Sequence, residues 1–205
     1  MVERVTKTPI ELYLIKNFYK KLGCNTLTYR PLRKFPKHRI VPTSIDPILR
    51  KGLIHGTVHD PIAALYGGIS GHAGLFSNAE DLAKILQMYL NNGTYGGESF
   101  FKEKSLKKFT AKAYPYSTNR RGLGFDKPQL DTTLVSPVAR ITSPFSYGHG
   151  GFTGILVWVD PVYDLIYIFQ SNRVHPNDWN RKIYNFNVRS NIHEVIYEAI
   201  TDKEM

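Results

Sequence analysis

Two runs of β-branched and aromatic residues constrain the fold of this chain more than any other feature. They cover residues 152–159 and 165–170, and residues 160–164 join them with a proline at the second position. Such side chains favour the pleated backbone of a strand, and a short connection places consecutive strands side by side in opposite directions. We therefore predict an antiparallel hairpin here, and a further short strand over residues 123–125.

Apolar residues at helical spacing predict four helices, over residues 8–23, 77–90, 104–109 and 187–200. Thr8 and Ser77 each stand three residues before a glutamate, which is the pattern of a capping box. Gly23 is expected to end the first helix in a left-handed conformation. The second helix is expected to bury Leu82, Ile85, Leu86 and Tyr89. The last is expected to bury the side that holds Ile192, Val195, Ile196, Ala199 and Ile200.

Together these elements predict an α/β (α+β) fold, with an antiparallel sheet flanked by helices. Prolines interrupt residues 25–61, which we expect to form an irregular loop layer. The chain has 205 residues, 42% of them hydrophobic, which is enough to bury one core and argues against disorder. Cys24 is the single cysteine, so an intramolecular disulfide framework and a cysteine-based zinc cluster are excluded.

Basic residues outnumber acidic ones, with 27 Lys plus Arg against 17 Asp plus Glu and a net charge of +10. This balance favours contact with nucleic acid, acidic lipid or an acidic polymer. The basic residues are scattered without an RNA-binding type of motif, so we do not expect nucleic acid as a partner. We expect no membrane span, because no apolar run approaches about 18 residues, and the first residues lack the apolar stretch of a secretory signal.

Residues 147–154 read Tyr-Gly-His-Gly-Gly-Phe-Thr-Gly and lead into the predicted hairpin. Two interpretations of His149 and its glycines remain open. The glycines can mark a bend before the strand beside a packed histidine, or they can let a ligand approach the backbone closely while the histidine orients it.

Three histidines near Asp60 suggest a possible metal site. His55, His59 and His72 lie in a glycine-rich region whose spacing does not fix ligand geometry. We therefore expect no metal and no other cofactor.

Several motifs resemble the serine β-lactamase and penicillin-binding-protein-like hydrolases, in particular the class C or esterase-like branch. They are Gly-His-Gly-Gly-Phe-Thr-Gly (148–154), Trp-Val-Asp-Pro (158–161), Ser-Asn-Arg-Val-His-Pro (171–176), Val-His-Asp (58–60), Gly-His-Ala-Gly-Leu-Phe-Ser (71–77) and Glu-Asp-Leu-Ala (80–83). The ending is also similar to modules fused behind bacterial β-N-acetylglucosaminidases. The resemblance implies that residues 1–205 are the C-terminal part of one β-lactamase-like sandwich, with the N-terminal strands and the nucleophile helix missing.

The family's chemistry needs a Ser-x-x-Lys motif, in which the amine takes the hydroxyl proton, and a facing Tyr-x-Asn element. In family order both precede Thr8, so we expect them upstream of Met1 and expect the chain alone to be inactive. Ser99 and Ser105 fit the first motif and Tyr89 fits the second. We interpret these as chance matches, because both serines follow the second helix and Tyr89 lies on its apolar face.

What carries over is the strand motif. The resemblance implies that His149 takes the place of the family's Lys or His, positions substrate and joins the proton network. It implies that the backbone N–H of Phe152 is the second oxyanion donor. Gly150 departs from the family, which has a threonine hydroxyl there. The remaining substrate-binding residues that the resemblance implies are Gly150, Gly151, Asp60 and His72.

The implied function is that of a serine hydrolase segment acting on an ester, amide or β-lactam carbonyl. Its expected partners are a small-molecule or peptidoglycan-like substrate and the missing N-terminal half of the domain, and the family implies the periplasm or cell envelope as location. A noncatalytic pseudoenzyme and a basic module that binds an anionic polymer are the alternatives. Without the missing strands we expect the isolated chain to be marginally stable or aggregation-prone.

Overall fold

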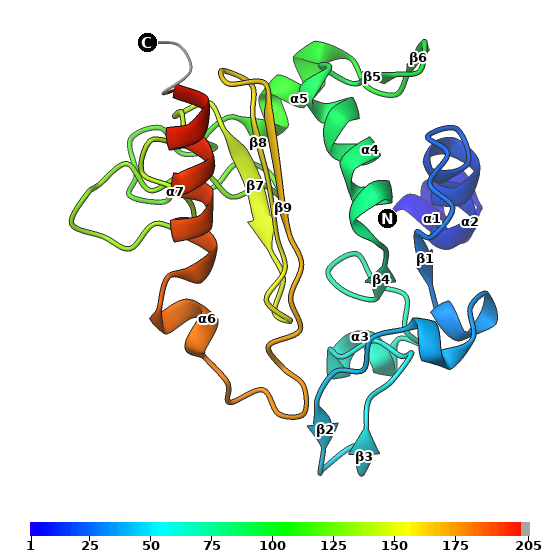
Figure 1. Cartoon of the computed structure of the whole chain (residues 1–205). Coiled ribbons are helices and arrows are strands. Elements are labelled where there is room, and N and C mark those ends of the chain that lie inside the picture. Colours follow the sequence, from blue (N-terminus) through cyan, green and yellow to red (C-terminus); the bar gives the residue numbers. More distant parts are fainter. Residues whose placement is uncertain (202–205) are drawn as a thin grey trace. The chain divides into compact units, whose positions relative to one another are not determined.

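The predicted hairpin supplies two strands of a three-stranded antiparallel sheet in the computed structural model, which describes residues 1–201 (Figure 1). The strands, in order across the sheet, are β7 (Tyr147–Gly150), β8 (Leu156–Asp160) and β9 (Leu165–Phe169). The hairpin is confirmed, although β8 begins at Leu156 because residues 151–155 turn between β7 and β8. Within the described part of the chain, the outer edge of β9 has no strand partner.

Both faces of this sheet are covered. On one face, Trp158 and Tyr167 pack with Val138 and with Ile196 of α7 (Val188–Thr201). On the other face, Val159 packs with Leu86, near the end of α4 (Ala79–Leu90). Within the second unit, α7 and the C-terminal residues of α4 lie on opposite sides of the sheet (Figure 1). Side chains alternate between two apolar layers, so β8 is buried on both faces.

The described residues divide into two compact units. The first unit comprises Met1–Ile85 and Asn172–Trp179, and the second comprises Leu86–Ser171 and the chain from Asn180 onward. The second unit holds the sheet together with β5 (Thr94–Tyr95), β6 (Glu98–Ser99), α5 (Glu103–Thr110) and α6 (Lys182–Asn185).

The first unit is made of short elements. They are α1 (Val2–Thr6), α2 (Ile10–Leu14), the π-helix η1 (Ile15–Tyr19), β1 (Thr28–Tyr29), the 3-10 helices η2 (Pro31–Arg33) and η3 (Lys37–Arg39), β2 (Ile45–Asp46), β3 (Gly52–Leu53), α3 (Pro61–Leu65) and β4 (Leu75–Phe76). β1 pairs with β4, and β2 pairs with β3. The irregular layer predicted for residues 25–61 is confirmed in character, and α3 at its end was not predicted.

Both predicted capping residues are wrong. The Thr8 hydroxyl donates to the carbonyl of Thr6, while the amide at the start of α2 donates to the Glu3 carboxylate at 2.9 Å. For α4, Asn78 accepts the amide of Asp81 at 2.9 Å, one residue after the predicted Ser77. The free amides at the start of α2 and α4 are thus capped by Glu3 and Asn78 instead of by the predicted Thr8 and Ser77.

Two further predictions fail. Residues 123–125 form no strand; the chain there makes a single bridge between Asp126 and Gly148. α7 buries His193 and Tyr197 rather than Ile192 and Val195, which are exposed. The Tyr197 hydroxyl donates to the Asp160 carboxylate at 2.6 Å, and Nδ1 of His193 accepts the amide of Ala139 at 3.5 Å, which offsets part of the cost of burying these two polar side chains. Among residues 1–201, no helix has both the length and the apolar character to cross a bilayer.

Candidate functional site

His149 lies on β7, opposite Val157 of β8, with its side chain exposed. Its Nδ1 is 2.8 Å from the carbonyl oxygen of Gly150, and its Nε2 is 3.3 Å from a guanidinium nitrogen of Arg121. A carbonyl only accepts and a guanidinium only donates, so the hydrogen sits on Nδ1 and Nε2 accepts from Arg121. This arrangement places the guanidinium cation of Arg121 beside the imidazole.

Arg121 is the site residue that sequence reasoning missed. It precedes the segment wrongly predicted as a strand, and it meets His149 because Asp126 pairs with Gly148 in both directions, at 2.7 and 3.1 Å. Arg120 forms a 2.8 Å ion pair with Asp126 and so anchors this segment. The adjacent Arg-Arg sequence was the available signal, but nothing in its spacing points to a histidine so far along the chain.

Lys127 adds a buried amine next to this bridge. Its Nζ donates to the carbonyl of Phe145 at 3.0 Å and lies 5.9 Å from the ring centre of Tyr147. Burial lowers the pKa of the Lys127 amine to about 8. The segment behind β7 is therefore cationic at its surface and holds a weakly basic amine inside.

The glycines of the motif differ in what surrounds them. A Cβ at Gly148 would stand 2.1 Å from the carbonyl oxygen of Val157 and 2.3 Å from the Trp158 ring. At Gly150 the nearest atom, a guanidinium nitrogen of Arg189, is 3.6 Å away, and Gly151 is similarly open. Gly148 is thus required by packing, whereas space alone does not explain why Gly150 replaces the family's threonine.

Phe152 lies in the turn after β7 with its side chain 58% exposed. The turn is closed by the amide of Gly151, which donates to the carbonyl of Ile155 at 2.7 Å, and by the amide of Gly154, which donates to Gly151. The oxyanion role of the Phe152 amide stays a prediction.

Asp60 and His72 meet in the first unit. The Asp60 carboxylate caps α3 by accepting the amide of Ala63 at 2.7 Å, and it lies 3.1 Å from Nε2 of His72. The Ala63 amide, then the His72 contact, hold the pKa of Asp60 below its usual range. Nδ1 of His72 is 2.7 Å from the Ser70 hydroxyl. The structure brings this predicted pair together, and His149 and Phe152 belong to the second unit.

The other two histidines have separate partners. His59 lies 2.9 Å from the Ser44 hydroxyl, and His55 donates to the carbonyl of Ile40 at 2.6 Å. Burial is the main cause that lowers the pKa of His59. Across residues 1–201, no group of three His, Cys, Asp or Glu side chains is placed to hold a metal ion.

The three chance motif matches lie where no nucleophile is favoured. Ser99 is in β6 and Ser105 is in α5, and both are exposed. Tyr89 packs edge-on against Phe125, with ring centres 5.6 Å apart, which fits the predicted core role.

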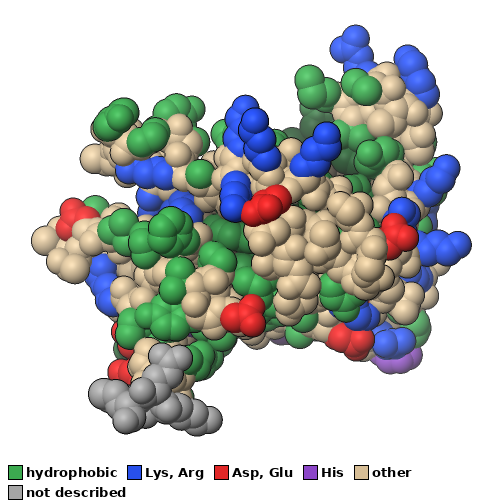
Figure 2. Space-filling model, turned by 90° about the horizontal axis from the view of Figure 1, so that it is seen from above, with side chains coloured by type: hydrophobic (Ala, Val, Ile, Leu, Met, Phe, Trp, Pro, Cys, Tyr) green, Lys and Arg blue, Asp and Glu red, His purple; other side chains and the backbone are tan. Residues whose placement is uncertain are grey.

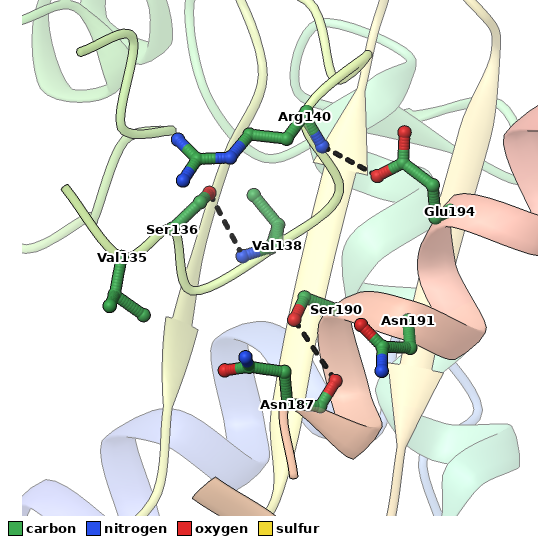
Figure 3. A pocket seen from close by; sticks show the side chains of 8 residues that line it. All are labelled: Val135, Ser136, Val138, Arg140, Asn187, Ser190, Asn191 and Glu194. Carbon is green, nitrogen blue, oxygen red and sulfur yellow. Dashed lines mark hydrogen bonds between the residues drawn. The ribbon is translucent and has the colours of Figure 1, made fainter. Parts of the chain in front are cut away.

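A small cavity of about 190 Å³ lies in the second unit between the 135–140 segment and the start of α7 (Figure 3). Its lining includes Arg140, whose amide donates to Glu194 at 2.7 Å, and Ser190. None of the predicted site residues lines it. Its volume is below the range typical of ligand pockets, so we do not assign it a substrate.

Solved structures with similar folds define the class. The chain aligns over 98% of its length with a β-lactamase from Mycobacterium bovis, with a TM-score of 0.61 at 19% identity and 60% of that chain covered. A LovD6 mutant of simvastatin synthase from Aspergillus terreus gives 0.66 at 20% identity, with 98% of this chain and 52% of that chain covered. The fold is therefore that of the β-lactamases and penicillin-binding proteins.

The chain belongs to the beta-lactamase family, whose model matches residues 1–186. A relative from Escherichia coli K12, named D-alanyl-D-alanine carboxypeptidase, is 36% identical over 188 residues, which is 85% of this chain and 42% of the relative. A relative of the same name from Salmonella schwarzengrund is 34% identical over 195 residues, 89% of this chain and 44% of the relative. The chain thus spans less than half the length of these relatives. The predicted family and fold are confirmed.

Proposed function

We propose that this chain forms the strand side of an acyl-transfer site in a β-lactamase-family hydrolase. The observation that carries the proposal is the contact between Arg121, in a loop, and His149 on β7, within a Gly-His-Gly-Gly-Phe motif. The reaction also needs a serine nucleophile with a lysine as proton acceptor, and the motif matches at Ser99 and Ser105 are exposed and lie apart from β7 in sequence. We therefore propose that a second polypeptide segment supplies the nucleophile.

The lengths of the relatives support this division. Each relative named above extends over more than twice the length matched here. A strand from such a segment would also pair with the outer edge of β9 and cover its backbone groups.

The substrate that we propose is a peptide ending in a free carboxylate, as in a D-alanyl-D-alanine terminus. This follows the names of the relatives and the position of Arg121, whose exposed guanidinium can bind a carboxylate with two parallel hydrogen bonds. Gly150 offers no hydroxyl for that contact, so Arg121 would provide the recognition.

In the proposed step the serine oxygen would bond to the substrate carbonyl carbon while the lysine amine takes the serine proton. The bond to the leaving amine would then break as that amine receives the proton, and water would hydrolyse the acyl-enzyme ester. Negative charge develops on the carbonyl oxygen, where the Phe152 amide would be one of two donors. His149, oriented by its contacts with Gly150 and Arg121, would position the substrate and keep Arg121 in place.

The first test is covalent labelling of the 205-residue chain. We expect no adduct with a fluorophosphonate and no turnover of a chromogenic β-lactam, measured by intact mass and absorbance. An adduct mapped to Ser99 or Ser105 would place the nucleophile inside the chain and overturn the proposal.

The second test restores the nucleophile by fusing this chain to the part of the E. coli relative that it does not match. We expect the fusion to be labelled and to release D-alanine from a peptide. Arg121→Gln should raise KM at least tenfold for that peptide and leave an ester without a carboxylate unaffected. Arg4→Gln, which removes an exposed charge in α1, is the matched control. Equal effects of both variants on both substrates would contradict the role of Arg121.

A further inference from the structure

Residues 30–53 of the first unit form an ordered basic and apolar surface, which we name the cationic hairpin surface. The segment contains seven Lys or Arg residues and a single acidic residue, Asp46. It runs through η2 and η3 into the β2–β3 hairpin. The carbonyl of Ile40, just after η3, accepts a hydrogen bond from His55, just after β3. The basic turns are thereby tied to the hairpin.

The hairpin exposes aliphatic side chains at its tip. Ile48 is 82% exposed, and Leu49 beside it is half exposed. Ile45 and Leu53 face each other across the two strands, and both are exposed as well. Four large aliphatic side chains within one short hairpin leave apolar surface in water, which favours a partner that removes it.

The tip is held in one conformation by its acidic residue. The Asp46 carboxylate accepts the amides of Ile48 and Leu49 at 3.0 Å and that of Arg50 at 3.3 Å. The Arg50 guanidinium in turn donates to the carbonyls of His59 and Asp60. Asp46 is therefore occupied within the hairpin, and the aliphatic side chains are presented without further ordering cost.

Exposed basic side chains lie in the same segment as this tip. Arg33, Lys37 and Arg39 are exposed on η2 and η3. Phe35, the aromatic ring among them, is half-buried, and the cationic groups of Lys34 and Arg39 lie 5.5 and 5.4 Å from its centre. A short segment that exposes both aliphatic and basic side chains suits the boundary between acyl chains and anionic headgroups. Nucleic acid would instead call for exposed stacking rings.

We propose that the cationic hairpin surface docks this protein on an anionic lipid surface, with Ile48 and Leu49 inserted at the headgroup level. This binding is independent of the proposed acyl-transfer function, because the assay reads lipid association and needs no turnover.

The test is flotation of the 205-residue chain with vesicles of phosphatidylcholine, with and without a third of phosphatidylglycerol. Lys and Arg side chains stand at many separate points of the molecule, as one face shows in Figure 2, so net charge alone must be controlled. R33Q/K37Q/R39Q removes three charges from the surface, and K104Q/K107Q/K108Q removes three exposed charges from α5. Circular dichroism verifies that both variants fold.

We expect the chain to float with the anionic vesicles only. The η2–η3 triple variant should lose affinity about a hundredfold, and the α5 variant less than about fivefold. Ile48→Ser with Leu49→Ser should lose at least about tenfold at unchanged charge. Equal losses of vesicle affinity in the two triple variants would show that binding depends only on net charge and would overturn the proposal. Absence of flotation would also overturn it and would leave a protein segment as the cover of the apolar tip.

Discussion

Replacing Asp160 by alanine should lower the free energy of unfolding of the second unit by about 4 kcal/mol. Asp160 is 1% exposed, and its carboxylate accepts four hydrogen bonds. The Ser143 amide and hydroxyl donate at 2.8 and 2.6 Å, the Tyr197 hydroxyl at 2.6 Å and the Val162 amide at 3.0 Å. Alanine leaves three buried donors without an acceptor, and each costs about 1 to 3 kcal/mol.

The assay is urea unfolding followed by the fluorescence of Trp158, which is buried in the second unit. Trp179 is 85% exposed and belongs to the first unit, so Trp179→Phe removes its signal at little cost. Glu198→Ala, at an exposed position of α7, is the control and should change stability by less than about 0.5 kcal/mol.

Tyr197→Phe should cost about 2 kcal/mol, because it removes one hydrogen bond to a buried charge. In D160A/Y197F the hydroxyl that lacked an acceptor is gone, so the double variant should lose at least about 1 kcal/mol less than the sum of the two single losses. Additive losses, or a loss below about 1 kcal/mol for Asp160→Ala, would refute the reasoning.

Three further predictions concern titration, packing and reactivity. Burial lowers the pKa of His193 to about 4 from 6.5, so the unfolded state binds more protons between these values. Stability should then fall by up to about 3 kcal/mol as pH drops from 6.5 to 4, and His193→Phe should flatten this dependence in pH-dependent urea titrations. Gly148→Ala should lower the free energy of unfolding by about 3 kcal/mol or more, because its Cβ would overlap the Val157 carbonyl and the Trp158 ring, whereas Gly150→Ala should lower it by less than about 1 kcal/mol. Similar melting temperatures for the two variants would contradict this packing argument. Burial raises the pKa of the Cys24 thiol to about 11, so its alkylation at neutral pH should be slow in the folded chain and fast in urea, and a fast native reaction would show that the first unit opens.

Periodicity predicted the hairpin and the longer helices, because both are set by local alternation of side chains. Periodicity did not predict the buried face of α7, because apolar residues occur on several sides of this helix. The buried face is determined instead by contacts of His193 and Tyr197 with other elements. His193 faces inward to stack on Tyr167, with ring centres 4.2 Å apart, and Tyr197 reaches Asp160. Such partners come from other elements and leave no periodic trace.

The candidate site shows the same division. The motif around His149 located the strand, since its glycines and histidine are contiguous in the sequence. Arg121 could not be predicted, because its contact depends on the path of a long loop back to β7. The resemblance implied that Asp60 and His72 bind substrate; their hydrogen bond places them together in the first unit, and their role in substrate binding stays a prediction.

The Asp160 network also determines how the hairpin aligns. Leu156 and Trp158 face one apolar layer, and Val157 and Val159 face another. If β8 shifted by one residue in the hairpin register, apolar side chains would still point into both layers, so apolar burial alone specifies the register weakly. The carboxylate breaks this degeneracy, since only one alignment lets Ser143 and Tyr197 reach it. The buried Asp160 carboxylate thus specifies the register in which β8 and β9 pair.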